Sequence, residues 1–362
     1  MMKLFKLLMY VVLLLLLNAY GVFAEKGPSV LFLNPGSPGD PFFSEMTSFM
    51  IAAADDLNMS LEVVHCNRSH LELRKKGLEI LDRERLPQYL LLINEKNGAV
   101  DVLEKASAKG VKVILFNEAL QPVDKKRLGR PGEILSNWIL EYLPNDRQAG
   151  YLLAKTLIEK AKSSGLNHRY KSLEMVAIAG NYRTGSSSER ISGLKDALKE
   201  FPEAVLMQIV PAYWEKERAM DVTRGLLSRY PEVKIVWAAS DLMASGAELA
   251  AGSENLAMRK KILIGGIDWT DEGLQNVADS KIVATVGGHF LDGGWVIVML
   301  HDYHHGIAFE QVELRSDFSV ITEENVEKYR KLFGRKEWSN IDFRRFSKVY
   351  NKSIEKYRFD LK

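Results

Sequence analysis

Short, almost continuous apolar runs alternate with amphipathic segments along most of this chain. Runs such as YLLLI at 89–93 and VKVILF at 111–116 lack a polar face, which is typical of parallel strands covered by helices on both sides. Similar strands are expected at 30–33 and 61–65, and apolar residues recur at helical spacing over 46–57. This βαβαβαβ order predicts a doubly wound α/β sheet with right-handed crossovers.

Local signals mark where some of the intervening segments begin and end. Ser69 followed by Glu72 forms a capping box, which predicts the start of a helix. The next helix is expected to begin near Asn97 and to stop at Gly110. Residues 121–131 are polar and basic, and we expect them to form a surface loop.

The same alternation starts again in the second half of the chain. Strands are expected at 175–179, 205–210, 234–238, 262–267 and 282–286, and helices near 188–201, 215–230, 243–252 and 271–278. A helix near 290–304, a strand at 312–319 and a charged, aromatic-rich tail follow. Two successive α/β units of similar size predict two Rossmann-like lobes of like architecture, and we expect the tail to pack as a terminal helix and extension.

The first 24 residues predict export rather than fold. Lys3 and Lys6 precede an apolar run at 7–17, and small residues precede a cleavage site after Ala24. An uncleaved membrane anchor is the alternative, but the run is shorter than the roughly 20 residues that span a bilayer. Cys66 is the only cysteine, so no internal disulfide can form despite export. We expect a signal peptide over 1–24 and a periplasmic protein.

Composition restricts the partners. The chain has 362 residues with 49 basic and 47 acidic side chains, so its net charge is +2. This balance predicts no strong attraction for nucleic acid or for acidic membranes. The length favours two domains.

The segment LNPGSPGDPFFSEM at 33–46 carries the first candidate site. Asp40 is a suitable N-cap and Pro41 a suitable first helical residue. Phe42 and Phe43 are adjacent, so they cannot both face the same core. At least one should point outward at the carboxyl edge of the strand, which is where open parallel sheets bind ligands.

Six segments together resemble a known group of proteins. They are DPFF after the first strand, LLIN at 91–94, NDRQAGYLLA at 145–154, SSSERISGLKDAL at 186–198, AASDLMASGA at 238–247 and IGGIDWTDEG at 264–273. Their order resembles that of the type 1 periplasmic binding proteins, of the ribose- and galactose-binding kind. The lobes of that family also occur in LacI-type repressors and in autoinducer-2 receptors. The resemblance covers about 28–322.

The resemblance implies a sugar-binding cleft and assigns residues to it. Phe42 and Phe43 match aromatics that stack on a sugar ring, and Asp40 matches a polar residue that bonds a hydroxyl. Arg190 matches an arginine that forks across sugar oxygens, unless it is a solvated helix-end residue. Asp268 matches a ligand-binding aspartate, with a structural role as the alternative. Rings and hydroxyl-binding groups together suit a sugar, which has apolar faces and a polar rim.

The opposing lobe and the hinge supply further candidates. Trp214 matches an aromatic of that lobe, although a core tryptophan or a cleft wall made by Tyr213 are alternatives. Trp269, next to Asp268, is also expected to reach the cleft. Near the hinge, His289 stands where sugar binders commonly place glutamine or asparagine.

Two positions depart from the pattern of ribose binders. Asn117 and Glu118 replace an aspartate-arginine pair, and Ser240 replaces an asparagine. Asn117 and Ser240 remain ligand-binding candidates, whereas Asp241 is expected to be a helix N-cap. Ribose is therefore disfavoured, and another sugar, a polyol or a furanosyl signal of the autoinducer-2 type remain open.

The family mechanism implies three chain crossings, near 141–143, 287–289 and 306–313. We expect an N-terminal lobe of 25–141 plus 289–312, a C-terminal lobe of 142–288 plus 313–322, and an extension of 323–362. Ligand should close the hinge without any bond being broken and without a cofactor. The closed form of this monomer would be presented to an ABC transporter, or alternatively to a membrane-bound sensor kinase or cyclase.

Two rival classes are disfavoured. GNYRTGSS at 180–187 lacks the lysine of a phosphate-binding loop, and Cys66 shows no sign of activation. His301 and His305 share a helix face, but no catalytic metal pattern accompanies them, so we expect no metal site and no enzyme. A repressor would need a DNA-binding helix-turn-helix where this chain has an export signal.

Overall fold

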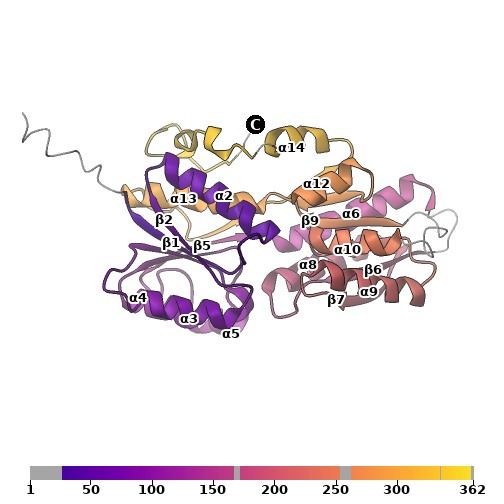
Figure 1. The fold of residues 1–362 in the computed structure, drawn as a ribbon, viewed down its shortest axis with the longest axis horizontal. Helices are drawn as coiled ribbons and strands as arrows, with labels where there is room; N and C mark the ends of the chain where they lie inside the picture. Colours follow the sequence, from indigo (N-terminus) through magenta and orange to yellow (C-terminus); the bar gives the residue numbers. More distant parts are fainter. Residues whose placement is uncertain (1–26, 167–171, 253–261, 335, 360–362) are drawn as a thin grey trace, which may run out of the picture.

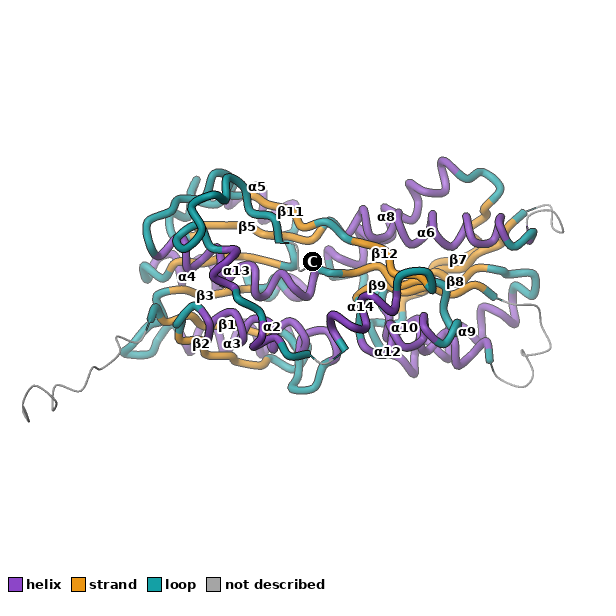
Figure 2. Tube along the Cα trace, turned by 90° about the horizontal axis from the view of Figure 1, so that it is seen from above, coloured by secondary structure: helices purple, strands orange, loops and turns teal. Residues whose placement is uncertain are grey.

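The structure is a computed structural model that describes residues 27–166, 172–252, 262–334 and 336–359. The expected signal peptide and its cleavage site lie outside these residues. Two α/β lobes lie beside each other along the long axis of the molecule (Figures 1 and 2). In the described part of the chain, no helix is both long and apolar enough to cross a membrane.

The N-terminal lobe is built on a six-stranded parallel sheet. Its strands run in the order β11 (Glu313–Ser316), β5 (Trp138–Pro144), β4 (Lys112–Phe116), β3 (Tyr89–Leu92), β1 (Ser29–Asn34) and β2 (Ser60–His65). Helices α2 (Pro41–Asp56) and α13 (Asp292–His304) cover one face, and α3 (His70–Ile80), α4 (Val100–Ala108) and α5 (Pro122–Leu128) cover the other (Figure 1).

The two faces of this sheet are buried in separate clusters. Val30 and Phe32 of β1 pack with the α2 and α13 side, whereas Leu31 and Leu33 pack with the α3 and α4 side. All four side chains are at most 1% exposed. Because alternate residues of a strand point to opposite faces, a strand with helices on both sides has to be apolar throughout.

The C-terminal lobe repeats this architecture with one antiparallel edge. Its strands run in the order β12 (Ser319–Thr322), β10 (Ala284–Gly287), β9 (Leu263–Asp268), β8 (Ile235–Ala238), β6 (Leu173–Ala179) and β7 (Ala204–Pro211), with β12 antiparallel to β10. Its helices are α6 (Asp146–Ser163), α8 (Gly185–Glu200), α9 (Lys216–Arg229), α10 (Asp241–Ala251) and α12 (Asp271–Ala278). The predicted fold class is confirmed.

Some local predictions were wrong. The expected loop at 121–131 contains helix α5, with Pro122 at its first position. Its Lys125 donates to both oxygens of the buried Glu141, at 2.9 and 3.0 Å. Strand β5 and helix α6 were not predicted at all. The single strand expected at 312–319 is two strands, β11 and β12, which belong to different sheets.

The chain crosses between the two sheets three times. It leaves the first sheet after Pro144, returns between Gly287 and the short helix η2 (His289–Leu291), and crosses again between Ser316 and Ser319. The middle crossing agrees with its predicted position. The first prediction was wrong because 141–143 lie inside β5, and the third because β11 pairs with β5 in the first sheet. Residues 313–316 therefore belong to the N-terminal lobe.

Asp292 links these crossings. It is 2% exposed and lies at the start of α13, immediately after the second crossing. Its Oδ2 accepts a hydrogen bond of 2.6 Å from Ser316 Oγ at the third crossing, and Tyr142 of β5 also bonds to it. Burial raises the pKa of Asp292 from 3.8 to about 8, against the effect of these two bonds.

The C-terminal extension contacts both lobes. Helix α14 (Val326–Phe333) and the short helices η3 (Trp338–Asn340) and η4 (Phe343–Phe346) run along one side of the molecule (Figure 1). Between α14 and η3, the Lys336 ammonium pairs with Glu45 of α2 and with Asp271 of α12. Near the end of the extension, the Tyr357 hydroxyl donates to Asp302 of α13 at 2.8 Å. The expected terminal helix and packed extension are observed.

We predict that Asp292→Asn flattens the pH dependence of stability. In the native protein this carboxyl stays protonated up to about pH 8, whereas in the unfolded chain it ionises near 3.8. Between these values unfolding releases a proton, so raising the pH favours unfolding by up to about 1.4 kcal/mol per pH unit. Urea unfolding across this window should show a steeper loss of stability in the wild type than in the variant. Parallel profiles would contradict the assignment.

Candidate ligand-binding cleft

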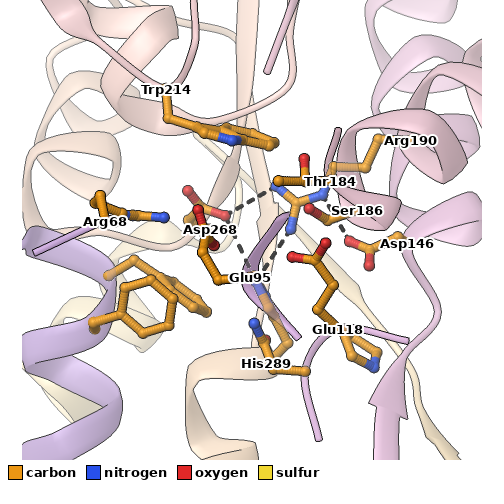
Figure 3. Close-up of a pocket in the computed structure, with 14 residues that line it drawn as sticks. Arg68, Glu95, Glu118, Asp146, Thr184, Ser186, Arg190, Trp214, Asp268 and His289 are labelled. Atoms are coloured by element: carbon orange, nitrogen blue, oxygen red, sulfur yellow. Dashed lines mark hydrogen bonds and ion pairs between the residues drawn. The ribbon is translucent and has the colours of Figure 1, made fainter. Parts of the chain in front are cut away.

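A cavity lies between the lobes. Residues at the carboxyl ends of strands from both sheets surround it (Figure 3). Its lining consists of Phe42, Phe43, Arg68, Glu95, Asn117, Glu118, Pro144, Asp146, Thr184, Ser186, Arg190, Trp214, Asp268 and His289. The structure thus brings together seven of the ten predicted residues: Phe42, Phe43, Asn117, Arg190, Trp214, Asp268 and His289. Asp40, Ser240 and Trp269 are not part of this lining.

The start of α2 places two aromatic rings at the cavity. Asp40 caps the helix by accepting a 3.1 Å hydrogen bond from Phe43 N, and Pro41 occupies the first helical position. Phe43 is 2% exposed, whereas Phe42 is half-buried and stacks on the ring of His289, with centroids 4.5 Å apart. The two neighbours therefore do not share one environment, as the sequence predicted, although both border the cavity.

Arg190 forms the floor of the cleft. Its Nε donates to Asp146 at 2.7 Å, its Nη1 to Ala239 O at 2.7 Å and to Asp268 at 3.1 Å, and its Nη2 contacts His289 Nε2 at 3.2 Å. Since it is 4% exposed, it is not a solvated helix-end residue. Four of its five N–H groups are engaged, so it can offer about one to a ligand. Its main effect is to hold two buried carboxylates.

Burial shifts the protonation of the groups around Arg190. The pKa of Asp268 is raised to about 8, mainly because burial disfavours the carboxylate. The pKa of His289 is lowered well below its usual value by burial and by the neighbouring guanidinium. His289 is therefore neutral at physiological pH. Asp268 also has φ of 139°, a strained conformation for a residue with a side chain.

Trp214 closes the opposite side. It lines the cavity, its ring lies 5.8 Å from Arg190 Cζ, and its backbone is left-handed with φ of 70°. A Cβ on Gly180 would lie 2.1 Å from the Trp214 ring, so only glycine leaves room for it there. Tyr213 is 40% exposed and lies outside this lining, but it lines an adjoining pocket together with Trp214 and Asp268.

Arg68 is the main cleft residue that the sequence reasoning missed. It follows β2 in a left-handed turn, with φ of 56°. Its Nε donates to Asp40 at 2.8 Å, and its guanidinium carbon lies 4.5 Å from the centre of the Phe43 ring. Because β2 pairs in parallel with β1, its carboxyl end opens onto the same edge as Asp40. The predicted parallel pairing of these two strands could therefore have placed Arg68 at the cleft.

Other missed residues line the cavity between the lobes. They are Glu95, Glu118, Asp146, Thr184 and Ser186. Glu118, of the N-terminal lobe, accepts a 2.9 Å hydrogen bond from Gly185 N at the start of α8 in the other lobe. This bond spans the cleft, so the structure has the lobes closed together.

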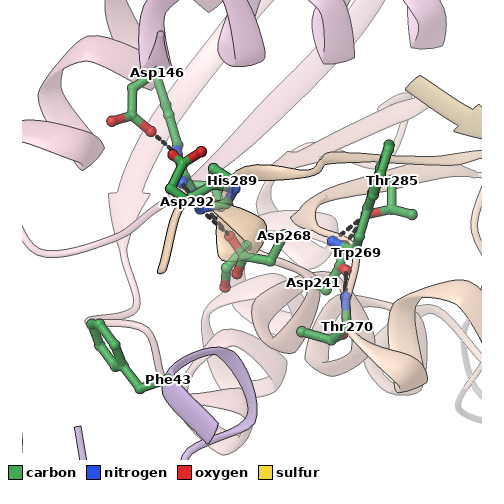
Figure 4. Close-up of polar contacts among 12 residues, drawn as sticks. Phe43, Asp146, Asp241, Asp268, Trp269, Thr270, Thr285, His289 and Asp292 are labelled. Carbon is green, nitrogen blue, oxygen red and sulfur yellow. Dashed lines mark hydrogen bonds and ion pairs between the residues drawn. The ribbon is translucent and has the colours of Figure 1, made fainter. Parts of the chain in front are cut away.

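Ser240 and Asp241, at the start of α10, make hydrogen bonds within the protein. Ser240, not Asp241, caps α10 by accepting from Met243 N at 3.3 Å. Asp241 is fully buried instead and accepts hydrogen bonds from Thr285 Oγ1 at 2.7 Å and from Thr270 N at 2.9 Å (Figure 4). The N-cap prediction for Asp241 was wrong because its carboxylate joins β10 to the start of α12.

Asp40 and Trp269 also lie outside the cavity lining. Asp40 holds Arg68 by an ion pair and, like Ser240, lines an adjoining pocket that shares Phe42 and Asp268 with the cavity. Trp269 packs against the extension, with its ring centre 4.7 Å from that of Tyr329. Its backbone is left-handed, with φ of 62°, so its side chain takes a different direction from that of Asp268.

The residues weighed as catalytic or metal-binding have other partners. His301 contacts the buried Asp302 at 3.2 Å and lies beside His305, with ring centres 4.3 Å apart. Over the described ranges, no group of three His, Cys, Asp or Glu residues is arranged to hold a metal ion. Burial raises the pKa of the Cys66 thiol to about 12, so it remains protonated.

Comparisons with known proteins agree with this geometry. The sequence profile of a family described as periplasmic binding protein domain matches residues 30–304. The crystal structure of a periplasmic sugar-binding protein from Pseudomonas fluorescens is similar with a TM-score of 0.79 and 30% identity, covering 91% of this chain and 96% of that one. The ribose import binding protein of Haemophilus influenzae is 28% identical over 68% of this chain and 75% of its own length. The D-apiose import binding protein of Actinobacillus succinogenes is 24% identical over 69% and 72%.

We predict that the two cleft arginines differ in their effect on folding. Arg190→Gln removes the buried cation that holds Asp146 and Asp268, so it should lower the free energy of unfolding by about 3 kcal/mol. Arg68→Gln removes a partly exposed ion pair, with 35% of the side chain exposed, and should cost less than about 1 kcal/mol. Urea unfolding of the ligand-free variants measures both. Equal losses would contradict the distinction.

Proposed function

This chain belongs to the periplasmic binding protein family, and from that premise we propose that it captures a sugar or sugar-like molecule between its lobes and presents the closed form to an ABC transporter. The observation that carries the proposal is the lining of the interlobe cavity. Aromatic rings of Phe42, Phe43 and Trp214 stand beside carboxylates and guanidinium groups. Such walls fit a molecule with apolar C–H faces and a rim of hydroxyl groups.

The names of the relatives support a carbohydrate ligand. They are import binding proteins for ribose and for D-apiose, and one further relative is the D-allose-binding periplasmic protein of Escherichia coli. These names favour delivery to a transporter over the alternative of a sensor of the autoinducer-2-receptor kind. Asn117 and Glu118 line the cavity at the positions where ribose binders have an aspartate-arginine pair. The proposed ligand therefore includes sugars other than ribose.

A hinge motion would give access to the cavity. The lobes are joined by three crossings, and the bond from Gly185 N to Glu118 is broken when they separate. A ligand that contacts both lobes stabilises the closed form because the open form lacks half of those contacts. The transporter can then distinguish loaded from empty protein by shape.

The proposal also covers export, the monomeric state and the absence of a chemical reaction. The leader at 1–24 would direct export and be removed, leaving a periplasmic monomer. The ligand would leave unchanged, since binding and release require no catalytic group and no cofactor. The residues that line the cavity would contact the ligand directly. Asp40 and Ser240 would hold those residues in position.

We predict that purified mature protein binds a carbohydrate and that Trp214→Ala weakens this binding. Mass spectrometry of the compound released on denaturation would identify the class of ligand, and calorimetry would measure its affinity, with D-ribose, D-allose and D-apiose as further probes. Loss of one ring face should weaken binding by at least ~10-fold, which corresponds to about 1.4 kcal/mol.

The control for this experiment is Tyr350→Ala, which removes an aromatic ring that is 55% exposed on the extension. It should leave the affinity unchanged. A protein that releases no carbohydrate and binds none of the probes would refute the proposed function. Equal affinities of the wild type and Trp214→Ala would refute the site.

A further inference from the structure

The cleft contains more carboxylates than cations. Five carboxylates line the cavity or pair with a residue that lines it, namely Asp40, Glu95, Glu118, Asp146 and Asp268. Three cations accompany them, namely Arg68, Lys96 and Arg190. Arg190 pairs with both Asp146 and Asp268, Arg68 with Asp40, and Lys96 with Glu95. Glu118 has no ion pair among the described residues.

Glu118 is also deeply buried. It is 4% exposed, and within the described part of the chain the only hydrogen bond of its side chain is the one that Oε1 accepts from Gly185 N. Burial and the neighbouring Glu95 raise the pKa of Glu118 well above its usual value, against the smaller lowering effects of the Gly185 N–H and of Arg68. A buried carboxylate without a cation is costly. Glu118 therefore either retains a proton or meets a positive charge supplied from outside the protein.

Two further acceptors that lack donors lie in the same lining. Glu95 Oε1 and Asn117 Oδ1 are buried and accept no hydrogen bond from any described residue. Lys96 Nζ is 3.2 Å from Glu95 Oε1, but the two are not aligned for a hydrogen bond. Glu95 itself is 3% exposed. Three side chains of the N-terminal lobe that line the cavity thus have acceptor capacity that no described residue uses.

An ammonium group matches this arrangement better than a hydroxyl does. It carries three donors, no acceptor and one positive charge, whereas a hydroxyl supplies one donor and no positive charge, so Glu118 keeps its proton beside it. The aromatic faces of Phe42, Phe43 and Trp214 in the same cavity also attract a cation.

We propose that the ligand is a sugar or polyol that bears a protonated amine, which binds against Glu118, Glu95 and Asn117. This inference rests on the proposed function and specifies its ligand. Arg68 lies across the cavity and would donate to the hydroxyls, because only its Nε has a hydrogen-bond partner in the described ranges (Figure 3). When the ammonium group binds, Glu118 gives up its proton to the buffer, and the resulting carboxylate pairs with the ligand cation.

The test compares matched pairs of probes by calorimetry: D-glucosamine with D-glucose, D-galactosamine with D-galactose, and D-glucamine with D-sorbitol. At least one amine should bind ~10-fold or more tightly than its neutral partner. Its binding heat should vary with the ionisation enthalpy of the buffer, as release of about one proton requires. If a neutral partner binds and no amine binds more tightly, the proposal is overturned while the proposed function stands.

The variant that isolates the charge is Glu118→Gln. Its amide oxygen can still accept from Gly185 N, and a thermal melt checks the fold. We expect the variant to bind the preferred amine ~100-fold more weakly and to release no proton on binding. The matched control is Glu79→Gln, which removes the same charge from a side chain that is 63% exposed on α3, and it should change nothing. An unchanged amine affinity in Glu118→Gln would overturn the proposal.

The compound released from the denatured protein decides the case in which no probe binds. An amine-bearing carbohydrate supports the inference. A carbohydrate without an amine overturns it but leaves the proposed function intact. If no carbohydrate is released and no probe binds, both are overturned.

Discussion

The buried guanidinium of Arg190 is the interaction on which the cleft depends. It connects four separate segments: the start of α6 through Asp146, the end of β8 through Ala239, the end of β9 through Asp268, and the hinge through His289. A buried cation with one partner missing would be strongly destabilising, so all four segments must be in place together. The C-terminal side of the cleft is therefore preorganised, while the rings of α2 and the Arg68 turn lie on the other lobe. Ligand binding therefore carries little entropic cost for ordering this side of the cleft.

The hinge has a second support, on the side away from the cavity. Asp292 joins the second and third crossings through Ser316, and Lys336 of the extension pairs with both lobes through Glu45 and Asp271. An opening that separates α2 from α12 must break one of these pairs or carry the extension with one lobe. The extension is therefore mechanically part of the hinge. Its aromatic contacts, such as Trp295 stacked on Phe359 at 4.5 Å, keep it attached to the N-terminal lobe.

The success of the sequence reasoning followed the strength of the local signal. Apolar runs such as YLLLI predicted the central strands because both faces of each sheet are covered. Strand β5 was missed because it contains Glu141, whose burial depends on Lys125 from an element that was itself expected to be a loop. The rings and Arg190 were found through motifs. Arg68, Glu95 and Glu118 were missed because their positions depend on strand-end turns and on contacts between distant segments, and their local sequence carries no sign of either.

The charges of the cleft are divided unequally between its two sides. On the C-terminal side four of the five N–H groups of Arg190 contact other residues of the protein, so this side offers a ligand few donors. On the N-terminal side Arg68 keeps its terminal nitrogens free of partners among the described residues, and Glu95, Asn117 and Glu118 keep acceptors free. Most of the donors and acceptors that are free to bind a ligand thus lie on the N-terminal lobe. Under the proposed hinge motion, discrimination between ligands would take place as the cleft closes, because the unpaired groups would be desolvated only then and a wrong ligand would leave one of them without a partner.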